Sequence, residues 1–388
     1  MILPPATLGI LGGGQLGRYF VRAAHDMGYR VIVLDSDPDS VAGRIADQHI
    51  VAPYDDKQAL AQLAQRCAAV TTEFESVPAA SLAYLADYVP VHPAPEAVAI
   101  CQERLAEKKF LKDMGFPHVP YSAVASEHDI EFADPALFPG ILKLTCFGYD
   151  GKGQARVKSK EEALAAFRQW GAASCVLERQ MNLDYEVSLV LARNSAGQIA
   201  CYPLAENHHE QGILDFSVVP APRANAELAQ KAQTIAREIA TRMAYVGTMA
   251  VEFFVADNQL YVNELAPRPH NSGHYTLDAC TTNQFEQQVR ALCGLPLGSV
   301  AMHSSAIMLN LIGDLWFGAS SAPSGEPEWN HLLSLPNLKL YNYGKIEARR
   351  GRKMGHFTVT GDNPQKLLKL AIEARATIGH RQTAPPAS

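Results

Sequence analysis

Short apolar runs alternate with amphipathic stretches over the first hundred residues of the chain. The runs TLGILG at 7–12 and RVIVLD at 30–35 have the length and composition of buried strands, and apolar residues at helical spacing separate them. The same alternation repeats up to residue 100. We expect strands at 7–12, 30–35, 68–72 and 89–91, and helices at 15–27, 57–67 and 78–87. Strands that alternate with helices in this way predict a parallel, doubly wound α/β sheet.

The pattern changes after residue 100. The charged segment 101–114 predicts a helix, and Gly115 and Pro117 are expected to end it. Apolar runs separated by turns then predict a small α+β unit, with strands at 140–144, 175–178, 186–192 and 199–202 and a helix at 160–170. Because 388 residues exceed one ordinary core, we expect three units, at 1–100, 101–205 and 206–388.

The last unit begins with a long helix, expected at about 227–244, followed by a pair of strands. The strands at 247–255 and 259–263 are joined by Asp257-Asn258, which suits a hairpin turn. The remaining elements are expected as strands at 305–312, 338–341 and 355–360 and a helix at 364–376.

Composition narrows the class of protein. Hydrophobic residues make up 47% of the chain and the formal net charge is −6, which argues against general affinity for nucleic acid. The seven cysteines form no CxxC pair, so neither a disulfide framework nor a structural zinc site is expected. The start, MILPPATLGILGGG, lacks a basic signal segment, and no apolar run approaches the roughly 18–20 residues of a membrane span. We expect a soluble cytoplasmic protein with no nucleic-acid or membrane partner.

A glycine-rich loop follows the first predicted strand. Gly12-Gly13-Gly14-Gln15-Leu16-Gly17 contains GxGxxG and opens a predicted helix, and Asp35 ends the next strand. This is the setting of a dinucleotide fingerprint, in which backbone N–H groups hold a phosphate. A tight turn between a strand and a helix produces the same letters, so the motif alone leaves both interpretations open.

A second glycine-rich segment, ILKLTCFGYDGKGQ at 141–154, places Lys143 at the end of an apolar strand. Gly148, Gly151 and Gly153 with Lys152 favour a loop whose amides and ammonium group approach nucleotide phosphates. The alternative is an ordinary hairpin turn at Asp-Gly. Farther on, CVLERQMNLDYE at 175–186 predicts a connector between two strands, with the backbone available to an adenine edge and a carboxylate available to ribose hydroxyls.

Two acidic positions lie within apolar strands. Glu252 in AVEFF and Glu264 in LYVNE belong to the two strands of the predicted hairpin, and Asn263 is next to the second. Unpaired carboxylates are costly to bury, so hard oxygen ligands for Mg²⁺ are favoured over two solvent-facing glutamates. The loop that follows contains Arg268, whose planar guanidinium suits a carboxylate or phosphate.

A basic cluster, GKIEARRGRKMGH at 344–356, lies near the end of the chain. It contains Lys345, Arg349, Arg350, Arg352 and Lys353. Such a run is either a solvated strand face or a local anion site, and the sequence pattern alone does not separate the two.

In this order, the lid GYDGKGQ, the hinge LERQM and the strands ending in NELAPRPHNSGH resemble the ATP-grasp superfamily. NELAPRPHNSGH, with YGK and RRGRKMGH near the end, is similar to one family within it, the 5-(carboxyamino)imidazole ribonucleotide synthases of purine biosynthesis. The resemblance covers nearly the whole chain, and NELAPRPHNSGH is specific whereas GGGQLGR is not. It implies an ATP-grasp fold, α/β and α+β, with an N-terminal doubly wound parallel-sheet domain that precedes it.

The resemblance also implies roles for individual residues. Contacts with ATP are implied for Arg104, Lys143, Gly148, Tyr149, Asp150, Gly151, Lys152, Gly153, Gln154, Glu178, Arg179, Gln180, Met181, Glu186 and His209. Glu252 and Glu264, with Asn263, would hold the phosphates and Mg²⁺, with Mn²⁺ as an alternative, while Arg268, His270 and Asn271 would surround bicarbonate. Tyr149, Asp150, Lys152, Lys345 and Arg352 would bind aminoimidazole ribonucleotide. In one departure from the expected pattern, Phe147 stands where glycine is expected before Gly148.

The implied reaction is ATP-dependent carboxylation of 5-aminoimidazole ribonucleotide with bicarbonate, through carboxyphosphate, in a homodimer. Asp150 or the departing phosphate are the candidates for the general base. Three alternatives stay open. They are a sister ligase such as formate-dependent glycinamide ribonucleotide transformylase or biotin carboxylase, an NAD-linked oxidoreductase built on the glycine loop, and a non-catalytic scaffold.

Overall fold

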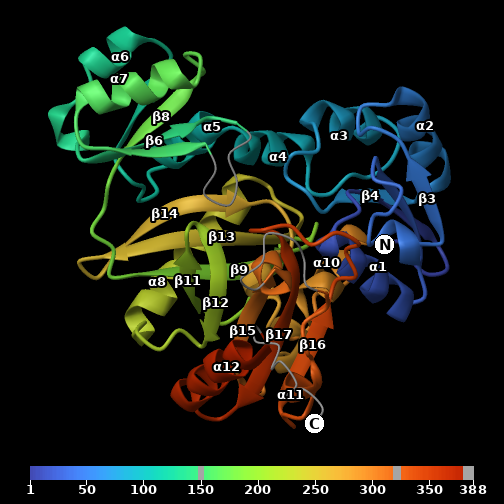
Figure 1. Ribbon diagram of the computed structural model, residues 1–388. Coiled ribbons are helices and arrows are strands. Elements are labelled where there is room, and N and C mark those ends of the chain that lie inside the picture. Colours follow the sequence, from blue (N-terminus) through green and yellow to red (C-terminus); the bar gives the residue numbers. More distant parts are fainter. Residues whose placement is uncertain (147–152, 318–324, 379–388) are drawn as a thin grey trace.

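The computed structural model describes residues 1–146, 153–317 and 325–378 (Figure 1). Within them the strands form three sheets: a parallel sheet of four strands, an antiparallel sheet of four and an antiparallel sheet of nine. The strands are β1 (Thr7–Leu11), β2 (Arg30–Asp35), β3 (Gln48–Val51), β4 (Ala69–Thr72), β5 (Tyr121–Val124), β6 (Gly140–Leu144), β7 (Gln154–Val157), β8 (Cys175–Arg179), β9 (Tyr185–Arg193), β10 (Ile199–Cys201), β11 (Ala205–Glu210), β12 (Ile213–Val219), β13 (Gly247–Ala256), β14 (Gln259–Ala266), β15 (Ser305–Ile312), β16 (Leu338–Asn342) and β17 (Lys353–Gly361).

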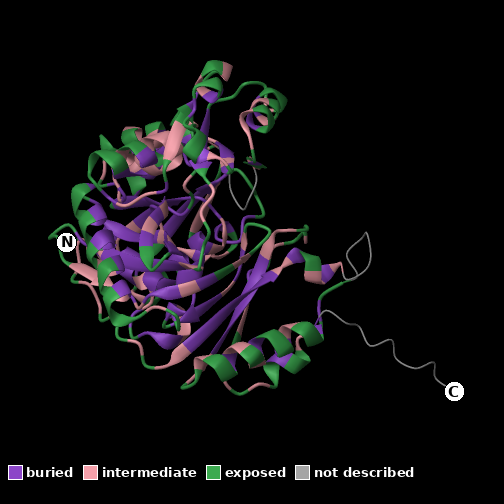
Figure 2. Cartoon of the chain, turned by 90° about the vertical axis from the view of Figure 1, so that its left-hand side faces the viewer, coloured by how far each residue is buried: buried purple, intermediate pink, exposed green. Residues whose placement is uncertain are grey.

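Most helices lie outside the sheets and expose one face, while many of the strands are buried (Figure 2). The α-helices are α1 (Gln15–Asp26), α2 (Lys57–Arg66), α3 (Ala79–Ala86), α4 (Pro95–Gln102), α5 (Arg104–Asp113), α6 (Glu127–Glu131), α7 (Lys160–Gln169), α8 (Ala226–Arg242), α9 (Thr276–Ala279), α10 (Gln284–Leu292), α11 (Asn330–Leu333) and α12 (Pro364–Ile378).

The N-terminal sheet has the strand order β3-β2-β1-β4, and every pairing in it is parallel. One of its faces packs on α1 and α10, and the other on α2 and α3, which confirms the predicted doubly wound arrangement. The strand expected at 89–91 does not form, because Val91 makes only an isolated bridge to Val70. The strand β3 was not predicted, since QHIV carries only two apolar residues.

The prediction of a single helix at 101–114 is wrong, because the helix is interrupted at Glu103. The Glu103 carboxylate accepts hydrogen bonds from the backbone N–H groups of Leu105 and Ala106 and so caps α5, while α4 ends one residue earlier. A side chain that satisfies the first N–H groups of a helix favours a start at that place. The break lets α4 and α5 connect the N-terminal sheet to the four-stranded lobe at the top of Figure 1.

That upper lobe is the sheet β5-β8-β6-β7, which packs on α6 and α7. Below it lies the nine-stranded sheet, in the order β14-β13-β9-β11-β12-β15-β17-β16 with β10 beside β9. The predicted hairpin of β13 and β14 is confirmed, and Asp257 and Asn258 turn it with φ of 50° and 58°. Left-handed conformation at both positions is what a two-residue hairpin turn requires.

Candidate functional site

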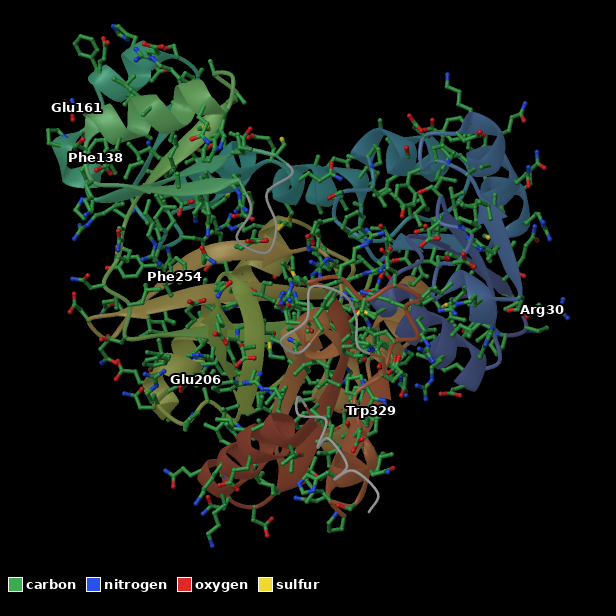
Figure 3. All side chains as sticks on the ribbon, in the orientation of Figure 1. Arg30, Phe138, Glu161, Glu206, Phe254 and Trp329 are labelled. Carbon is green, nitrogen blue, oxygen red and sulfur yellow. The ribbon has the colours of Figure 1, made fainter. Side chains whose placement is uncertain are left out.

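The three sheets meet around a pocket of about 250 Å³. The N-terminal sheet contributes the loop after β4, the helices α4 and α5 form one wall, the upper lobe contributes the end of β6, and β14 closes the other side. The pocket is lined by Phe74, Glu75, Ser76, Pro78, Cys101, Gln102, Arg104, Glu107, Thr145, Cys146 and Glu264. Figure 3 shows the side chains of the described residues on the ribbon, in the orientation of Figure 1.

Glu252 and Glu264 are direct cross-strand partners in the pairing of β13 with β14, so their side chains leave the same face of the sheet. Glu252 Oε1 lies 3.2 Å from His270 Nε2, and Glu264 Oε2 lies 3.7 Å from Arg104 Nη1. Burial alone would raise the pKa of Glu252, but His270, His209 and Lys353 outweigh it and hold that pKa at about 2.

The pKa of Glu264 is raised instead, first by burial and then by the neighbouring Glu252 and Glu75, although Arg104 opposes the shift. Its side chain remains 42% exposed where it faces the pocket, so water screens part of this effect. A carboxylate pushed toward its neutral form by like charges gains from a cation placed between it and its neighbour.

This donor set fits a divalent cation that shares its coordination with a substrate. In the described part of the chain, no group of three or more His, Cys, Asp or Glu side chains is arranged to hold a metal alone. Mg²⁺ takes one or two carboxylates together with waters and phosphate oxygens, and the two cross-strand glutamates would provide the carboxylates.

A buried charge cluster lies beside the acidic pair. Glu178 at the end of β8 contacts Lys143 Nζ at 2.7 Å and Lys108 Nζ at 3.4 Å. The two lysines and the glutamate are at most 8% exposed. Lys108 also donates to the backbone carbonyl of Asn263, at 3.1 Å, so the cluster ties α5 and the upper lobe to β14.

The predicted hinge connects the upper lobe to the nine-stranded sheet. Glu178 and Arg179 end β8 in the upper lobe, and the chain passes through Gln180 and Met181 to β9 in the nine-stranded sheet. Farther along, the ring nitrogen Nδ1 of His209 lies 2.9 Å from Glu186 Oε2, so these two residues, each predicted to contact ATP, contact one another.

The predicted lid is described only at its two ends. Lys143 on β6 pairs with Gln154 on β7, and Gly153 before it has φ of 68°. The remaining predicted lid residues lie outside the described residues; they are Gly148, Tyr149, Asp150, Gly151 and Lys152, together with Phe147.

The loop after β14 presents three further predicted residues. Arg268 forms an ion pair with Glu75 through Nε and Nη2, and its Nη1 donates to the carbonyl of Pro269 at 3.1 Å. His270 lies against Glu252, and Asn271 donates to Asn310 Oδ1 at 3.0 Å. The structure therefore places His270 against Glu252, while Arg268 pairs with Glu75 and interacts electrostatically with Glu264.

The backbone N–H groups of the N-terminal glycine loop donate to carboxylates of the protein itself. Gly14 N and Gly17 N donate to the Glu73 carboxylate at 2.6 and 2.7 Å, and Gly13 N donates to Asp35 Oδ2 at 2.6 Å. The two carboxylates occupy the N–H groups that a dinucleotide phosphate would need. This arrangement argues against the oxidoreductase interpretation of the motif.

We predict that Gly12→Ala destabilises the protein because the glycine is needed for packing. A Cβ at Gly12 would lie 2.5 Å from Glu73 Cγ, and φ is +105° there. The expected loss of unfolding free energy is at least about 2 kcal/mol. Gly115→Ala is the control, because φ is +75° there but a Cβ would meet nothing within 4 Å. Equal losses in urea-induced unfolding of both variants would contradict the clash with Glu73.

The basic segment joins the C-terminal strands to the N-terminal sheet. Lys345 Nζ donates to the carbonyl of Lys353 at 2.7 Å, and Arg352 Nη1 donates to that of Glu347 at 2.8 Å. From the other side, Arg18 donates to the carbonyls of Asn342 and Tyr343 and Arg44 to that of Gly344. The segment thus lies beside α1, close to the glycine loop that α1 follows.

Glu73, Glu75 and Lys108 are among the charged residues at the site that sequence reasoning missed. Glu73 and Glu75 follow β4 directly, at the carboxyl edge of the parallel sheet, where ligands of such sheets bind. That position was a usable signal in the string TTEFE. The sequence around Lys108 did not indicate a role, because a lysine in a charged helix is expected to face solvent. Its near-complete burial is seen only in the folded chain.

Comparison with known proteins identifies three consecutive domains. Residues 5–102 match the ribonucleotide synthetase preATP-grasp domain, 109–285 the ATP-grasp domain, and 306–370 the phosphoribosylaminoimidazole carboxylase C-terminal domain. These matches confirm the fold expected from the sequence. No helix in the described ranges is both long and apolar enough to cross a membrane.

Named proteins are similar to this chain over nearly its full length. The N5-carboxyaminoimidazole ribonucleotide synthase of Bacillus subtilis strain 168 is 41% identical over 92% of both chains. That of Brucella melitensis biotype 1 is 44% identical, over 92% of this chain and 96% of its own.

Solved structures agree with these sequences. The crystal structure of an ADP complex of an N5-carboxyaminoimidazole ribonucleotide synthetase has 40% identity and a TM-score of 0.90, covering 97% of both chains. The Aspergillus clavatus N5-carboxyaminoimidazole synthase in complex with ADP and 5-aminoimidazole ribonucleotide has 29% identity and a TM-score of 0.85, covering 95% of this chain and 98% of its own. On this evidence, the chain belongs to the family of N5-carboxyaminoimidazole ribonucleotide synthases.

Proposed function

We propose that the chain joins 5-aminoimidazole ribonucleotide to bicarbonate at the expense of ATP, giving 5-(carboxyamino)imidazole ribonucleotide, ADP and phosphate in purine biosynthesis. Membership of the family makes it an ATP-dependent ligase. The observation that carries the proposal is the cross-strand pair of Glu252 and Glu264, which lies beside the loop of Arg268 and His270.

The assigned roles follow the charges of the site. Glu252 and Glu264 would hold Mg²⁺, or Mn²⁺ in its place, and this metal would neutralise charge on the transferred phosphoryl group. Lys143, Arg104 and the hinge from Glu178 to Met181 would position ATP. Arg104 lines the pocket, Lys143 lies near the end of β6, and the hinge begins at the end of β8. Positioning and charge neutralisation supply most of the catalysis of phosphoryl transfer.

Bicarbonate is a poor electrophile, and phosphorylation by ATP would convert it to carboxyphosphate. Arg268 would stabilise this mixed anhydride, with His270 and Asn271 around it. In a closed pocket, carboxyphosphate would release CO₂, and the exocyclic amine of the ribonucleotide would capture it. Exclusion of water limits hydrolysis of the intermediate. Asp150 or the departing phosphate would accept the proton of the amine.

The function is tested by measuring ADP release with different acceptors. We expect release that depends on both 5-aminoimidazole ribonucleotide and bicarbonate, and not on formate or biotin, which the sister ligases would use. A titration of NADH followed by its fluorescence tests the oxidoreductase alternative. Stimulation by formate, or saturable NADH binding, would overturn the proposal. A homodimer and a cytoplasmic location are both proposed from the family resemblance. The homodimer is checked by sedimentation of the purified protein.

Lys345→Ala is predicted to weaken ribonucleotide binding, because the variant lacks the ammonium group that would contact the 5′-phosphate. The loss of one charge-assisted hydrogen bond should raise the KM for the ribonucleotide roughly ten- to hundredfold and leave kcat nearly unchanged. Lys339→Ala is the control, since Lys339 lies on β16 nearby and is 69% exposed. An unchanged KM in the Lys345 variant would remove this residue from the phosphate site.

A further inference from the structure

A continuous chain of hydrogen bonds runs from the middle of the nine-stranded sheet to His270. Ser217 Oγ donates to Asn207 Oδ1 at 2.8 Å, and Asn207 Nδ2 donates to Ser188 Oγ at 2.9 Å. Ser188 Oγ lies 2.7 Å from Ser272 Oγ, and this hydroxyl lies 2.8 Å from His270 Nδ1. The chain therefore ends on the ring nitrogen that does not face the acidic strands.

The register of the sheet holds these residues in a row. Ser188 on β9 is the direct cross-strand partner of Glu252 on β13, and Asn207 on β11 is the direct partner of Ser217 on β12. Cross-strand partners project from the same face of a sheet, so the row has a fixed spacing. Ser272 reaches it from the short helix of Asn271–Gly273 that follows β14.

Each member of the row is buried. Ser188 is 1% exposed, Asn207 6%, and Ser217 and Ser272 0%. A buried hydroxyl or amide costs free energy unless it is hydrogen-bonded, and apolar side chains would fill the same positions without that requirement. Packing alone therefore does not account for four consecutive polar side chains that lead to one histidine.

The hydrogen bonds run in a single direction. An amide nitrogen only donates, so the oxygen of Ser188 accepts from Asn207 and its own hydrogen is available to Ser272. The Ser272 hydroxyl then donates to His270 Nδ1, and the backbone N–H of Ser272 donates to the same atom at 3.3 Å. With Nδ1 as an acceptor, the ring proton is on Nε2, which lies 3.2 Å from Glu252 Oε1. This tautomer is assigned from the hydrogen-bond partners.

We propose that Ser217, Asn207, Ser188 and Ser272 form a positioning chain that fixes the orientation and tautomer of His270 and so presents its Nε2–H group to the site. The inference rests on the proposed function, in which His270 lies beside bicarbonate and its phosphorylated form. An N–H donor held in place suits an anion that develops charge during the reaction, because it needs no reorientation. The four residues act only through His270, as the partners of a functional histidine commonly do.

The direct test determines the tautomer of His270 by NMR of protein labelled with ¹⁵N at its histidines, in the absence of ATP and metal. His270→Gln identifies the His270 signals by their loss. We expect the unaltered protein to show Nε2–H and a bare Nδ1. Ser272→Ala removes the hydroxyl donor but keeps the backbone N–H at Nδ1, so we expect a minor Nδ1–H population to appear in this variant. The same variant should lower kcat for bicarbonate-dependent ADP release about ten- to hundredfold while the KM for ATP stays unchanged.

Ser188→Ala is the second variant, because it leaves Ser272 in place and removes only the group that directs its hydroxyl. It should move both readouts in the same direction by a smaller factor. Ser81→Ala is the matched control, since Ser81 is 4% exposed in α3 and outside this row, and it should move neither readout.

A single Nε2–H tautomer and full kcat in both the Ser272 and Ser188 variants would overturn the proposal. So would an equal loss in Ser81→Ala, which would assign the effect to general loss of packing. If the unaltered protein released no ADP with bicarbonate and the ribonucleotide, the proposed function would fall. The tautomer measurement would still decide whether the chain fixes His270.

Discussion

Glu264→Gln is expected to abolish bicarbonate-dependent ADP release. The amide keeps the shape of the side chain but carries no charge, so the pair with Glu252 would lose the anionic oxygen that a divalent cation requires. Loss of a group that merely orients a ligand already costs ten- to hundredfold, and we expect a fall of at least about a hundredfold here. ADP release is measured at saturating ATP, bicarbonate and Mg²⁺.

Glu127→Gln is the matched control for this variant. Glu127 is on α6, far along the chain from the acidic strands, and its side chain is 44% exposed in an ion pair with Arg168. This substitution makes the same chemical change at the surface and should leave ADP release unaltered. Full bicarbonate-dependent turnover in Glu264→Gln would show that the metal assignment is wrong. Raised Mg²⁺ that restores part of the activity would support it.

The pairing of Glu252 with Glu264 could be predicted because its signal is local. Two carboxylates in strongly apolar strands are costly to bury, and the turn at Asp257-Asn258 fixed the pairing that brings them together. The strand β11 could not be found in the same way. AENHHE in β11 has little apolar character because Asn207 belongs to the buried hydrogen-bond row, so the usual alternation of apolar and polar residues is missing.

Contacts between distant segments escaped prediction for a different reason. Arg268 was expected to meet a substrate anion, and nothing in its surroundings in the sequence indicates Glu75, which lies 193 positions away. The glycine loop shows the opposite failure, since its letters suggest a dinucleotide while Glu73, 56 positions from Gly17, supplies the carboxylate that its amides bind. Local pattern indicates which groups are chemically able to act, and only the fold determines their partners.

Glu178→Gln is expected to destabilise the protein by about 3–5 kcal/mol, because it would leave two buried ammonium groups without a counter-charge. Lys143 and Lys108 contact opposite oxygens of this carboxylate, and all three side chains are nearly inaccessible to water. An amide can accept a hydrogen bond from one lysine but neutralises neither. Urea-induced unfolding without ATP measures the loss, so that a role of Glu178 in nucleotide binding does not enter.

The pH dependence of stability separates this charge effect from a change of shape. Burial would raise the pKa of Glu178, but Lys108 and Lys143 outweigh it and lower the pKa from 4.5 to about 2. A carboxylate with a depressed pKa stabilises the folded state above pH 4.5, and this contribution is lost as the pH falls toward 2. The difference in stability between the unaltered protein and Glu178→Gln should therefore be largest above pH 4.5 and shrink below it. A difference that stayed constant down to pH 3 would mean that packing, and not the charge of Glu178, holds the two lysines in place.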